Sequence, residues 1–213
     1  SVTSHRGCAG GCAFCALTAH QGKSVTSRSS ESVLDEVKAI TDHPDFKGTI
    51  NDIGGPTANM WQGHCTKPGG CSRASCLWPS RCTHFADDQD GYRELLAAAA
   101  DLPGVRHLFV TTGVRMDLLA PNRALLKSLA QHHTSGHLKV APEHTVPSVL
   151  HHMRKPAGDA FEQVVQTHRA LSRKAGKHQF VVPYLMAAHP GCTLDDMVQL
   201  GRVLRSHNIK AEQ

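Results

Sequence analysis

The hydrophobic positions of this chain follow two different periods, which predict helices and buried strands in alternation. Residues 31–42 carry apolar side chains three or four positions apart, the spacing of one helix face, and Ser29 or Ser30 precedes them as an N-cap. Further helices are predicted at residues 92–101, 121–133, 159–176 and 193–207. Between them, short β-branched or apolar runs predict strands at residues 48–53, 105–112, 137–141 and 179–187.

The ends of several predicted helices carry recognisable signals. Pro121 suits the first turn of its helix. Asp159 and Glu162 have the spacing of a capping box, and Gly176 is placed to end the same helix. Thr193 is the expected N-cap of the last helix. These signals support the helical interpretation of the periodic segments.

The alternation of elements predicts an α/β fold built on a parallel sheet. A strand before Arg6 and the four strands above give about five βα units, and a sixth strand begins near Asn208 and stops. Such units are joined by right-handed crossovers. Five or six of them fit either an open doubly wound sheet or a partial βα barrel. In both, the chemistry belongs at the carboxyl ends of the strands.

The chain length fits one domain or part of a larger one. All 213 residues are expected to form one core domain, with residues 57–90 as an insert after the second strand, because that stretch is rich in cysteine and has no hydrophobic period. The chain starts at Ser1 rather than methionine and ends as a strand begins. We therefore expect an excerpt of a longer protein.

Composition narrows the class of protein only moderately. The formal net charge of +5 permits an anionic partner such as RNA without requiring one, and most of the 16 histidines are expected to be exposed and chemically idle. No segment approaches the roughly 20 apolar residues of a membrane helix, and no signal peptide is visible. These features predict a soluble, cytoplasmic protein without a membrane partner.

The most informative motif is a group of three cysteines directly after the first strand. Cys8, Cys12 and Cys15 lie within eight residues, with two glycines between the first two of them. Three thiolates on a four-iron cluster leave one iron without a protein ligand, which is the open position that a catalytic metal needs. A zinc site, with His5 or His20 as the fourth ligand, is an alternative. A disulfide is not typical of a cytosolic chain.

A second group of cysteines lies in the insert. Cys65, Cys71, Cys76 and Cys82 occur in a loop without hydrophobic period, and a loop of that length normally needs something to organise it. A bound metal would do so. A second iron–sulfur cluster, a structural zinc ion, or four unrelated cysteines all fit the spacing. Cys192 stands alone and is expected to be an ordinary loop residue.

The first cysteine motif, with Phe14 directly before its third cysteine, resembles that of the radical SAM superfamily. The resemblance implies a partial parallel (βα)6 barrel whose last strand is truncated here. It also implies a [4Fe-4S] cluster on Cys8, Cys12 and Cys15 that binds S-adenosyl-L-methionine (SAM). With an electron from a reductant such as flavodoxin or ferredoxin, that family cleaves SAM to a 5′-deoxyadenosyl radical, which abstracts hydrogen from a substrate.

The resemblance also implies contacts to SAM at the ends of later strands. The residues matched to SAM contacts are Phe14, Gly54, Gly55, Glu143, Pro190 and Gly191. Pro56 follows the glycine pair where the superfamily commonly has a glutamate, so the contact to the SAM amino group is expected to use backbone carbonyls.

More narrowly, the chain resembles the YgiQ family of radical SAM proteins. The runs that support this are residues 6–15, 52–60, 139–145 and 184–191. Members of that family are longer on both sides, in agreement with the expected excerpt. The resemblance implies the cofactor and the fold and leaves the substrate unknown.

Three cations near predicted strand ends bear on the substrate. Arg115, Arg154 and Lys155 are placed to meet anionic groups, and the segment before the last two is similar to one in radical SAM enzymes that modify tRNA. Solvated cations at helix ends are the alternative. The leading hypothesis is an enzyme that makes a radical of an unknown substrate. The alternatives are a tRNA-modifying radical SAM enzyme, a non-catalytic iron–sulfur electron carrier, and a zinc-stabilised nucleic-acid-binding module.

Overall fold

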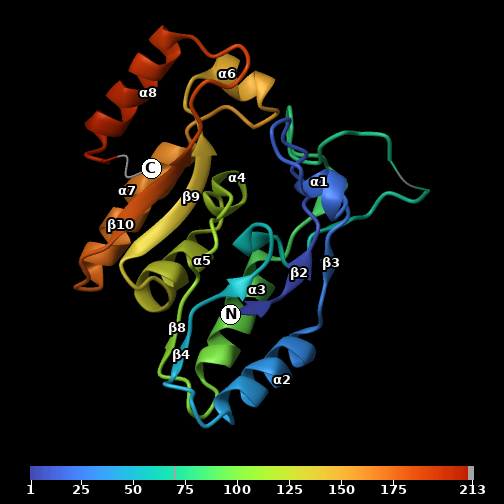
Figure 1. Cartoon of the computed structure of the whole chain (residues 1–213), viewed down its shortest axis with the longest axis vertical. Helices are drawn as coiled ribbons and strands as arrows, with labels where there is room; N and C mark the ends of the chain where they lie inside the picture. Colours follow the sequence, from blue (N-terminus) through green and yellow to red (C-terminus); the bar gives the residue numbers. More distant parts are fainter. Residues whose placement is uncertain (70, 211–213) are drawn as a thin grey trace.

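The computed structural model describes residues 1–69 and 71–210 as an α/β fold (Figure 1). Its strands are β1 (Val2–Thr3), β2 (His5–Arg6), β3 (Thr26–Ser27), β4 (Thr49–Ile50), β5 (Ile53–Gly54), β6 (His64–Cys65), β7 (Phe85–Ala86), β8 (His107–Leu108), β9 (His137–Glu143) and β10 (Phe180–Leu185). Its helices are α1 (Leu17–His20), α2 (Ser30–Thr41), the 3₁₀ turn η1 (Ala58–Met60), α3 (Gln89–Ala100), α4 (Met116–Leu119), α5 (Arg123–Ser128), the π-helix η2 (Leu129–His133), α6 (Pro147–His152), α7 (Ala160–Lys174) and α8 (Leu194–Ser206). Within these described ranges, no helix is both long and apolar enough to cross a membrane.

The strands follow one another across the molecule in the order of the sequence. β1 pairs with β5, β4 pairs with β8, and β9 pairs with β10, all in parallel. A parallel bridge between Val114, which follows β8 in the sequence, and Val140 of β9 links the second of these pairs to the third. This order is that of a barrel, because a doubly wound sheet would reverse its strand order midway. The expected partial barrel is confirmed, and it is open, since no pairing in the described residues joins β10 to β1.

Helix caps explain where several helices begin. The Ser29 hydroxyl accepts a hydrogen bond from the Ser32 amide and starts α2. Thr193 and Asp196 form a complete capping box at α8. The predicted capping box at Asp159 is wrong: its backbone (φ −95°, ψ 6°) is not extended, and its carboxylate accepts a hydrogen bond from the Gln163 side chain instead.

Other boundaries differ from the sequence pattern for local reasons. α3 begins three residues earlier than predicted, because the Asp88 carboxylate accepts the Gly91 amide at 2.8 Å. The predicted helix 121–133 begins after its N-cap Asn122 and changes to a π-helix at Leu129. The short helices α1, α4 and α6 were not predicted. The expected sixth strand is absent at residues 209–210, and its remainder, residues 211–213, lies outside the described residues.

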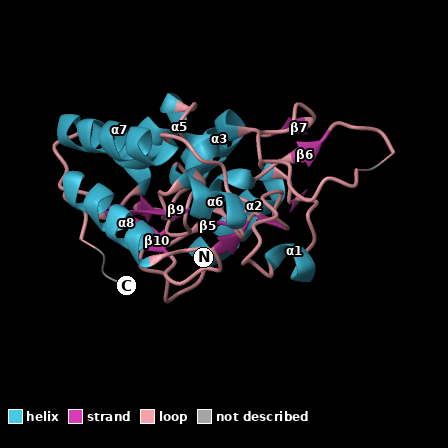
Figure 2. Cartoon of the chain, turned by 90° about the horizontal axis from the view of Figure 1, so that it is seen from above, coloured by secondary structure: helices cyan, strands magenta, loops and turns pink. Residues whose placement is uncertain are grey.

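One large hydrophobic core lies between the strands and the long helices. In Figure 2, helices α3, α5 and α7 form a row along one side of the strands. Tyr92 on α3 is completely buried, and its hydroxyl donates to the Ile53 carbonyl at 2.6 Å. Burial, and next to it the Asp52 carboxylate, raises the pKa of Tyr92 well above its usual value. The core thereby fixes the second strand, whose end carries the glycine pair.

The insert, residues 57–90, is more ordered than its sequence suggests. It starts with η1, and its two arms pair antiparallel as β6 and β7, with Cys65 opposite Phe85. A small second core holds it against the first cysteine motif and consists of Ala9, Met60, Leu77, Phe85 and Leu118. The absence of a hydrophobic period did not exclude a hairpin, because strands of two residues are too short to show one.

Candidate functional site

The three cysteines of the first motif lie on one tight loop between β2 and α1, here called the cluster loop (residues 7–16). Its turns need glycine at several positions. Gly7 and Gly11 have φ values of +83° and +60°, and a Cβ at either would overlap a carbonyl oxygen, that of Ser24 or Ala74. A Cβ on Gly10 would lie 2.6 Å from Nη1 of Arg115. Glycine therefore lets other segments approach the thiols closely.

The thiols of the cluster loop are free and half-buried. The Gly10 amide donates to Sγ of Cys8 at 3.4 Å, and Nη1 of Arg115 lies 3.8 Å from Sγ of Cys12. Burial raises the pKa of Cys8, while the positive charge of Arg115 opposes this effect. N–H···S hydrogen bonds and a buried cation both stabilise thiolates. Three such thiols fit an iron–sulfur cluster, whose protein ligands are cysteine thiolates.

Two buried ion pairs lie beside these thiols. Nε and Nη2 of Arg115 contact the Asp117 carboxylate at 3.0 and 2.9 Å. Asp117 raises the pKa of Arg115 against the effect of burial, and Arg115 in turn lowers the pKa of Asp117. Lys155 lies 3.5 Å from Glu143, and burial together with Arg115 lowers its pKa. Two cations in one buried region suit an anionic ligand or cluster.

The run of residues 52–60, distinctive in the sequence, positions this region. The Asn59 side chain accepts the Arg115 amide at 2.8 Å and donates to the Arg115 carbonyl at 3.0 Å. The Met60 side chain also contacts the cluster loop, since its Sδ accepts a hydrogen bond from the Ala9 amide at 3.3 Å. Asp52 accepts the amides of residues 111 and 112. Sequence reasoning missed Asn59 and Asp117 as site residues, because their roles depend on contacts between distant segments or on burial.

The glycine pair at the end of β5 has no room for side chains. A Cβ on Gly55 would lie 2.6 Å from Nε2 and from the carbonyl oxygen of His5. The Gly54 carbonyl accepts the amide and the hydroxyl of Ser4. The Gly55 carbonyl accepts no hydrogen bond from the described part of the chain. Of the two carbonyls, that of Gly55 is the one left for a ligand.

Glu143 lies at a strained strand end. Its φ of +63° is unusual for a residue with a side chain, and a register shift in β10 lies opposite it. Its carbonyl accepts the Met186 amide at 2.9 Å, which joins the ends of β9 and β10. Strained backbone is typical of functional sites, and here it aims the Glu143 carboxylate toward Lys155.

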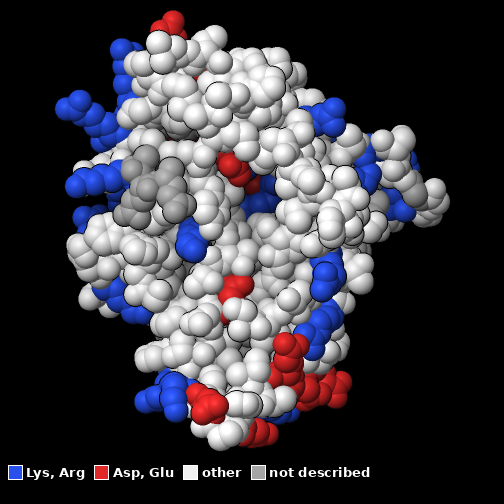
Figure 3. All heavy atoms as spheres, in the orientation of Figure 1, with Lys and Arg blue, Asp and Glu red and all other residues white. Residues whose placement is uncertain are grey.

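The cluster loop reaches across to the far strands of the barrel. The Ala13 amide donates to the Met153 carbonyl after α6, and Phe14 meets His189 edge to face at 6.2 Å. His189 precedes Pro190 and Gly191, so the structure brings these predicted site residues near Phe14. Figure 3 shows a hollow between the two halves of the molecule, with acidic and basic side chains at its bottom.

A cavity of about 440 Å³ adjoins the buried charges. Its walls include Arg115, Asp117, Pro142, His144 and Lys155. His144 is buried, which lowers its pKa, and its Nε2 lies 3.7 Å from Sγ of Cys192. The cavity is large enough for a small organic molecule.

The three cations predicted near strand ends differ in their surroundings. Arg154 is exposed, in agreement with a solvated cation. For Arg115 and Lys155 that alternative is wrong, because their side chains are only 7% and 8% exposed and both are ion-paired. Charged side chains are seldom buried in proteins, so these two buried ion pairs mark a candidate functional site.

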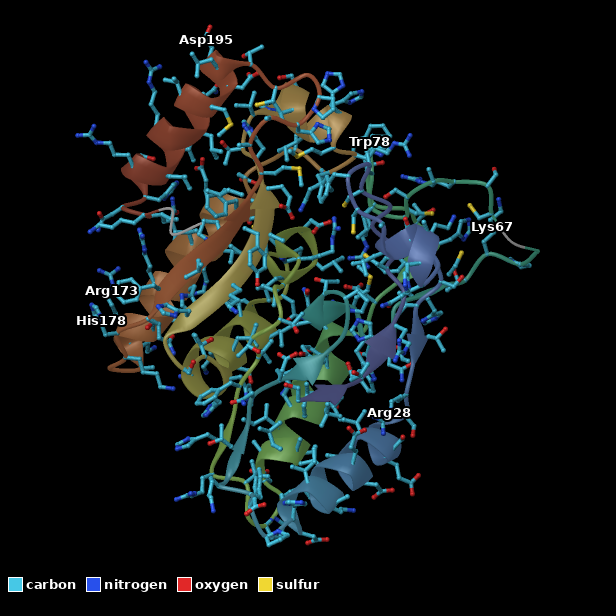
Figure 4. All side chains as sticks on the ribbon, in the orientation of Figure 1. Arg28, Lys67, Trp78, Arg173, His178 and Asp195 are labelled. Atoms are coloured by element: carbon cyan, nitrogen blue, oxygen red, sulfur yellow. The ribbon has the colours of Figure 1, made fainter. Side chains whose placement is uncertain are left out.

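The insert cysteines lie beside the cluster loop. Cys65 and Cys71 are exposed, whereas Cys76 and Cys82 are half-buried. Across residues 1–69 and 71–210, no three cysteine, histidine or acidic side chains lie close enough to hold a single metal ion. Trp78 lies where the insert meets α6 (Figure 4), with its ring 5.2 Å from that of His151. Trp78 therefore connects the insert to the barrel, while Leu77 is buried in the insert core.

Known proteins resemble this chain along its whole length. The sequence is 46% identical over 216 residues to a UPF0313 protein of Methanosarcina acetivorans, covering 100% of this chain and 29% of the relative. It is 47% identical to a UPF0313 protein of Geobacter sulfurreducens, covering 100% of this chain and 36% of that relative. The chain thus spans about a third of the length of the curated relatives it matches.

Solved structures show the same fold. TsrM of Kitasatospora setae, a radical S-adenosylmethionine methyltransferase solved with tryptophan substrate and a SAM analogue, superposes with a TM-score of 0.62 over 98% of this chain and 34% of its own, at 16% identity. A second TsrM structure, with cobalamin and a [4Fe-4S] cluster bound, gives the same TM-score at 14% identity. The profile described as the Radical SAM superfamily matches residues 2–204. The chain belongs to the radical SAM superfamily of iron–sulfur enzymes, and within it to the YgiQ or UPF0313 family.

Proposed function

We propose that Cys8, Cys12 and Cys15 ligate a [4Fe-4S] cluster that leaves one iron open for SAM. The observation that carries this proposal is that one tight loop holds three free, half-buried thiols, with the Gly10 amide donating to Sγ of Cys8 at 3.4 Å and the Cys15 amide donating to the Cys12 carbonyl at 3.2 Å. The set has three members, as an open cluster requires, and it lies at the carboxyl ends of the barrel strands. When bound, the reduced cluster supplies the electron that cleaves SAM to methionine and a 5′-deoxyadenosyl radical.

The residues around the loop are suited to hold SAM. The Gly55 carbonyl, which has no partner among the described residues, would accept a hydrogen bond from the SAM amino group, and Glu143 would contact its polar groups. Phe14, Pro190 and Gly191 would border the adenine, since Phe14 already contacts the loop before them. Pro56 has no side-chain hydrogen-bond acceptor, so a backbone carbonyl of the preceding glycine pair would accept the hydrogen bond from the SAM amino group.

The buried cations would hold the anionic partners of the reaction. Arg115 keeps its charge because Asp117 pairs with it, and it lies next to the thiols. Burial and the positive charge of Arg115 lower the pKa of Lys155. Its ammonium group lies 3.5 Å from the Glu143 carboxylate and would face the SAM carboxylate. The electron would come from a one-electron donor protein such as flavodoxin or ferredoxin. The roles of these side chains are to orient the ligand and to keep water out.

The substrate would enter the cavity beside Arg115. That cavity of about 440 Å³ has polar and apolar walls, which suits a small organic molecule. A tRNA substrate would have to reach the same cavity. Arg154 is an exposed cation directly before Lys155, which lines that cavity. Since the chain is a third of its relatives' length, other parts of such proteins would take part in choosing the substrate.

One experiment tests this function. The chain is reconstituted with iron and sulfide without air, mixed with dithionite and SAM, and 5′-deoxyadenosine is measured. We expect wild type to form it and Cys12→Ala to form none. Cys192→Ala is the matched control for cluster loading, because Cys192 is a half-buried cysteine outside the loop, and it should keep the iron content of wild type. A loaded chain whose cluster does not respond to SAM would instead be an electron carrier.

A further inference from the structure

Four cysteines of the insert have no role in the proposed reaction. We infer that Cys65, Cys71, Cys76 and Cys82 bind a second iron–sulfur cluster, in which every iron has a thiolate ligand. Such a closed cluster would not bind SAM. The inference concerns a separate site and holds whether or not the cluster loop cleaves SAM.

The structure gathers the four cysteines although the sequence separates them. Cys65, Cys71 and Cys76 line one cavity of about 270 Å³ together with Lys23. Cys76 and Cys82 pack against the small core whose members Ala9 and Phe85 also line this cavity. Two hydrogen bonds bring in the fourth cysteine, since the Cys82 amide donates to the Cys76 carbonyl at 2.7 Å and the Phe85 amide donates to the Cys82 carbonyl at 3.0 Å.

The surroundings of these thiols are typical of thiolate ligands. The Arg73 amide donates to Sγ of Cys71 at 3.3 Å, just as the Gly10 amide donates to Cys8 in the cluster loop. The ammonium group of Lys23 lies against the Cys71 and Arg73 carbonyls, and Lys23 lines the same cavity as Cys65 and Cys76. Hydrogen bonds to sulfur and nearby cations are what stabilise iron–sulfur clusters in proteins.

The outer part of the insert has little else to hold it. The arms between β6 and β7 contribute Leu77 to a core, while Cys65 and Cys71 are exposed. Polar contacts dominate, and the Arg73 side chain donates to the carbonyls of Ser75 and Trp78. A segment that buries so little apolar surface gains its order from a ligand, and four thiols are the groups available for one.

Ligand spacing favours a cluster over a zinc ion. Zinc holds four thiolates about 2.3 Å from one centre, so their sulfurs lie within about 4 Å of each other. Among residues 1–69 and 71–210, no three such donor side chains lie close enough to hold a single metal ion. A four-iron cluster puts each thiolate on a different iron and so spreads the sulfurs around a larger space, such as the cavity of about 270 Å³.

The second site adjoins the first one directly. The Cys76 amide donates to the Ala9 carbonyl at 2.9 Å, and the Ser75 hydroxyl donates to the Gly10 carbonyl at 2.5 Å. Cys8, Cys76 and Cys82 all pack against the same small core. A cluster in the insert would therefore fix the back of the cluster loop.

The test counts metal in two complementary variants. Both are reconstituted anaerobically with equal supplies of iron, zinc and sulfide, and iron, zinc and acid-labile sulfide are measured per chain. One variant carries Cys8→Ala, Cys12→Ala and Cys15→Ala. The other carries Cys65→Ala, Cys71→Ala, Cys76→Ala and Cys82→Ala. Cys192→Ala serves as the matched control and should keep the full iron content of wild type.

We expect each variant to keep about half of the wild-type iron and sulfide. The remaining cluster of the first variant should give an electron paramagnetic resonance spectrum that SAM does not change. Iron that disappears completely with the cluster-loop cysteines would overturn the inference, and so would zinc bound in place of iron. If the insert variant fails to fold, as circular dichroism would show, the cluster-loop variant alone decides. A SAM-insensitive spectrum in the insert variant would contradict the proposed function only.

Discussion

The two cysteine sets of this chain lie side by side but are built differently. The cluster loop places three thiols within eight residues, half-buried next to a buried arginine. The insert spreads four thiols over eighteen residues, two of them exposed, and Lys23, which lines the same cavity, is only partly buried. We expect the first set to depend on the packing around the cluster loop for its shape, and the proposed second site to depend on what it binds.

The comparison shows how a protein separates an open site from a closed one. In the proposed scheme, the cluster loop would hold a cluster with three ligands and leave one position for a second molecule. A fourth ligand would close that position and suits a site whose role is to hold the chain together. The hydrogen bonds from Ser75 and Cys76 to the cluster loop connect the two sites.

The largest effect is expected from removing one ligand of the open site. Cys12→Ala should abolish formation of 5′-deoxyadenosine, because two thiolates no longer hold the cluster with one defined open iron. Cys71→Ala in the insert should leave measurable product, since the cluster loop keeps its three ligands. The comparison is made by product per bound iron. Equal loss in both variants would mean that the two sets form one centre.

A large effect on stability is expected at the buried cation. Arg115→Met leaves the buried Asp117 carboxylate without a partner and should lower the free energy of unfolding by about 3–5 kcal/mol. Adding Asp117→Asn should restore most of it. The insert counterpart, Lys23→Met, should cost less than about 1 kcal/mol, because that cation is partly solvated. Denaturant unfolding measures all three, and a similar cost for Lys23→Met would refute the difference between the sites.

The contact between the two sites is tested at Gly11. Gly11→Ala forces a Cβ onto the Ala74 carbonyl of the insert at a positive φ and should cost about 3 kcal/mol. Gly22→Ala is the matched control, because Gly22 also has a positive φ but no neighbour within 4 Å of a Cβ. It should cost about 1 kcal/mol. If both substitutions cost the same, the insert does not constrain the cluster loop.

The smallest effect is expected on the pH dependence of folding stability, which is measured separately from any loss of the clusters in acid. Burial lowers the pKa of His168 to about 4 from 6.5, and neither ring nitrogen has a partner. The unfolded chain takes up a proton there below pH 6.5, so stability is full above that pH and falls toward pH 4, by on the order of 2 kcal/mol. His168→Leu should reduce this slope, although buried His5 keeps part of it. The same substitution at exposed His43 is the matched control.

Much of the fold could be predicted from the sequence because it depends on local patterns. The alternation of apolar runs predicted the segments that form the three parallel strand pairs, and Ser29 and Thr193 predicted two helix starts. The failed capping box at Asp159 shows the limit of such patterns, since the same residues need an extended backbone that the preceding turn does not allow.

The site was predictable where its residues are adjacent in sequence and not elsewhere. The cysteine spacing indicated both thiol sets, but the hydrogen bonds from Asn59 to Arg115 join residues 56 positions apart. No local pattern encodes such a pairing. Burial likewise decides that Arg115 and Lys155 belong to the site while Arg154 does not, and burial depends on the packed structure.

The most direct test uses the variant that lacks the four insert cysteines. It is loaded anaerobically with iron and sulfide and reduced, and its electron paramagnetic resonance spectrum is recorded before and after SAM is added. Ligation by Cys8, Cys12 and Cys15 with one open iron predicts a four-iron signal that SAM changes. A four-iron signal that stays the same with saturating SAM, or no such signal at all in a folded chain, would contradict it.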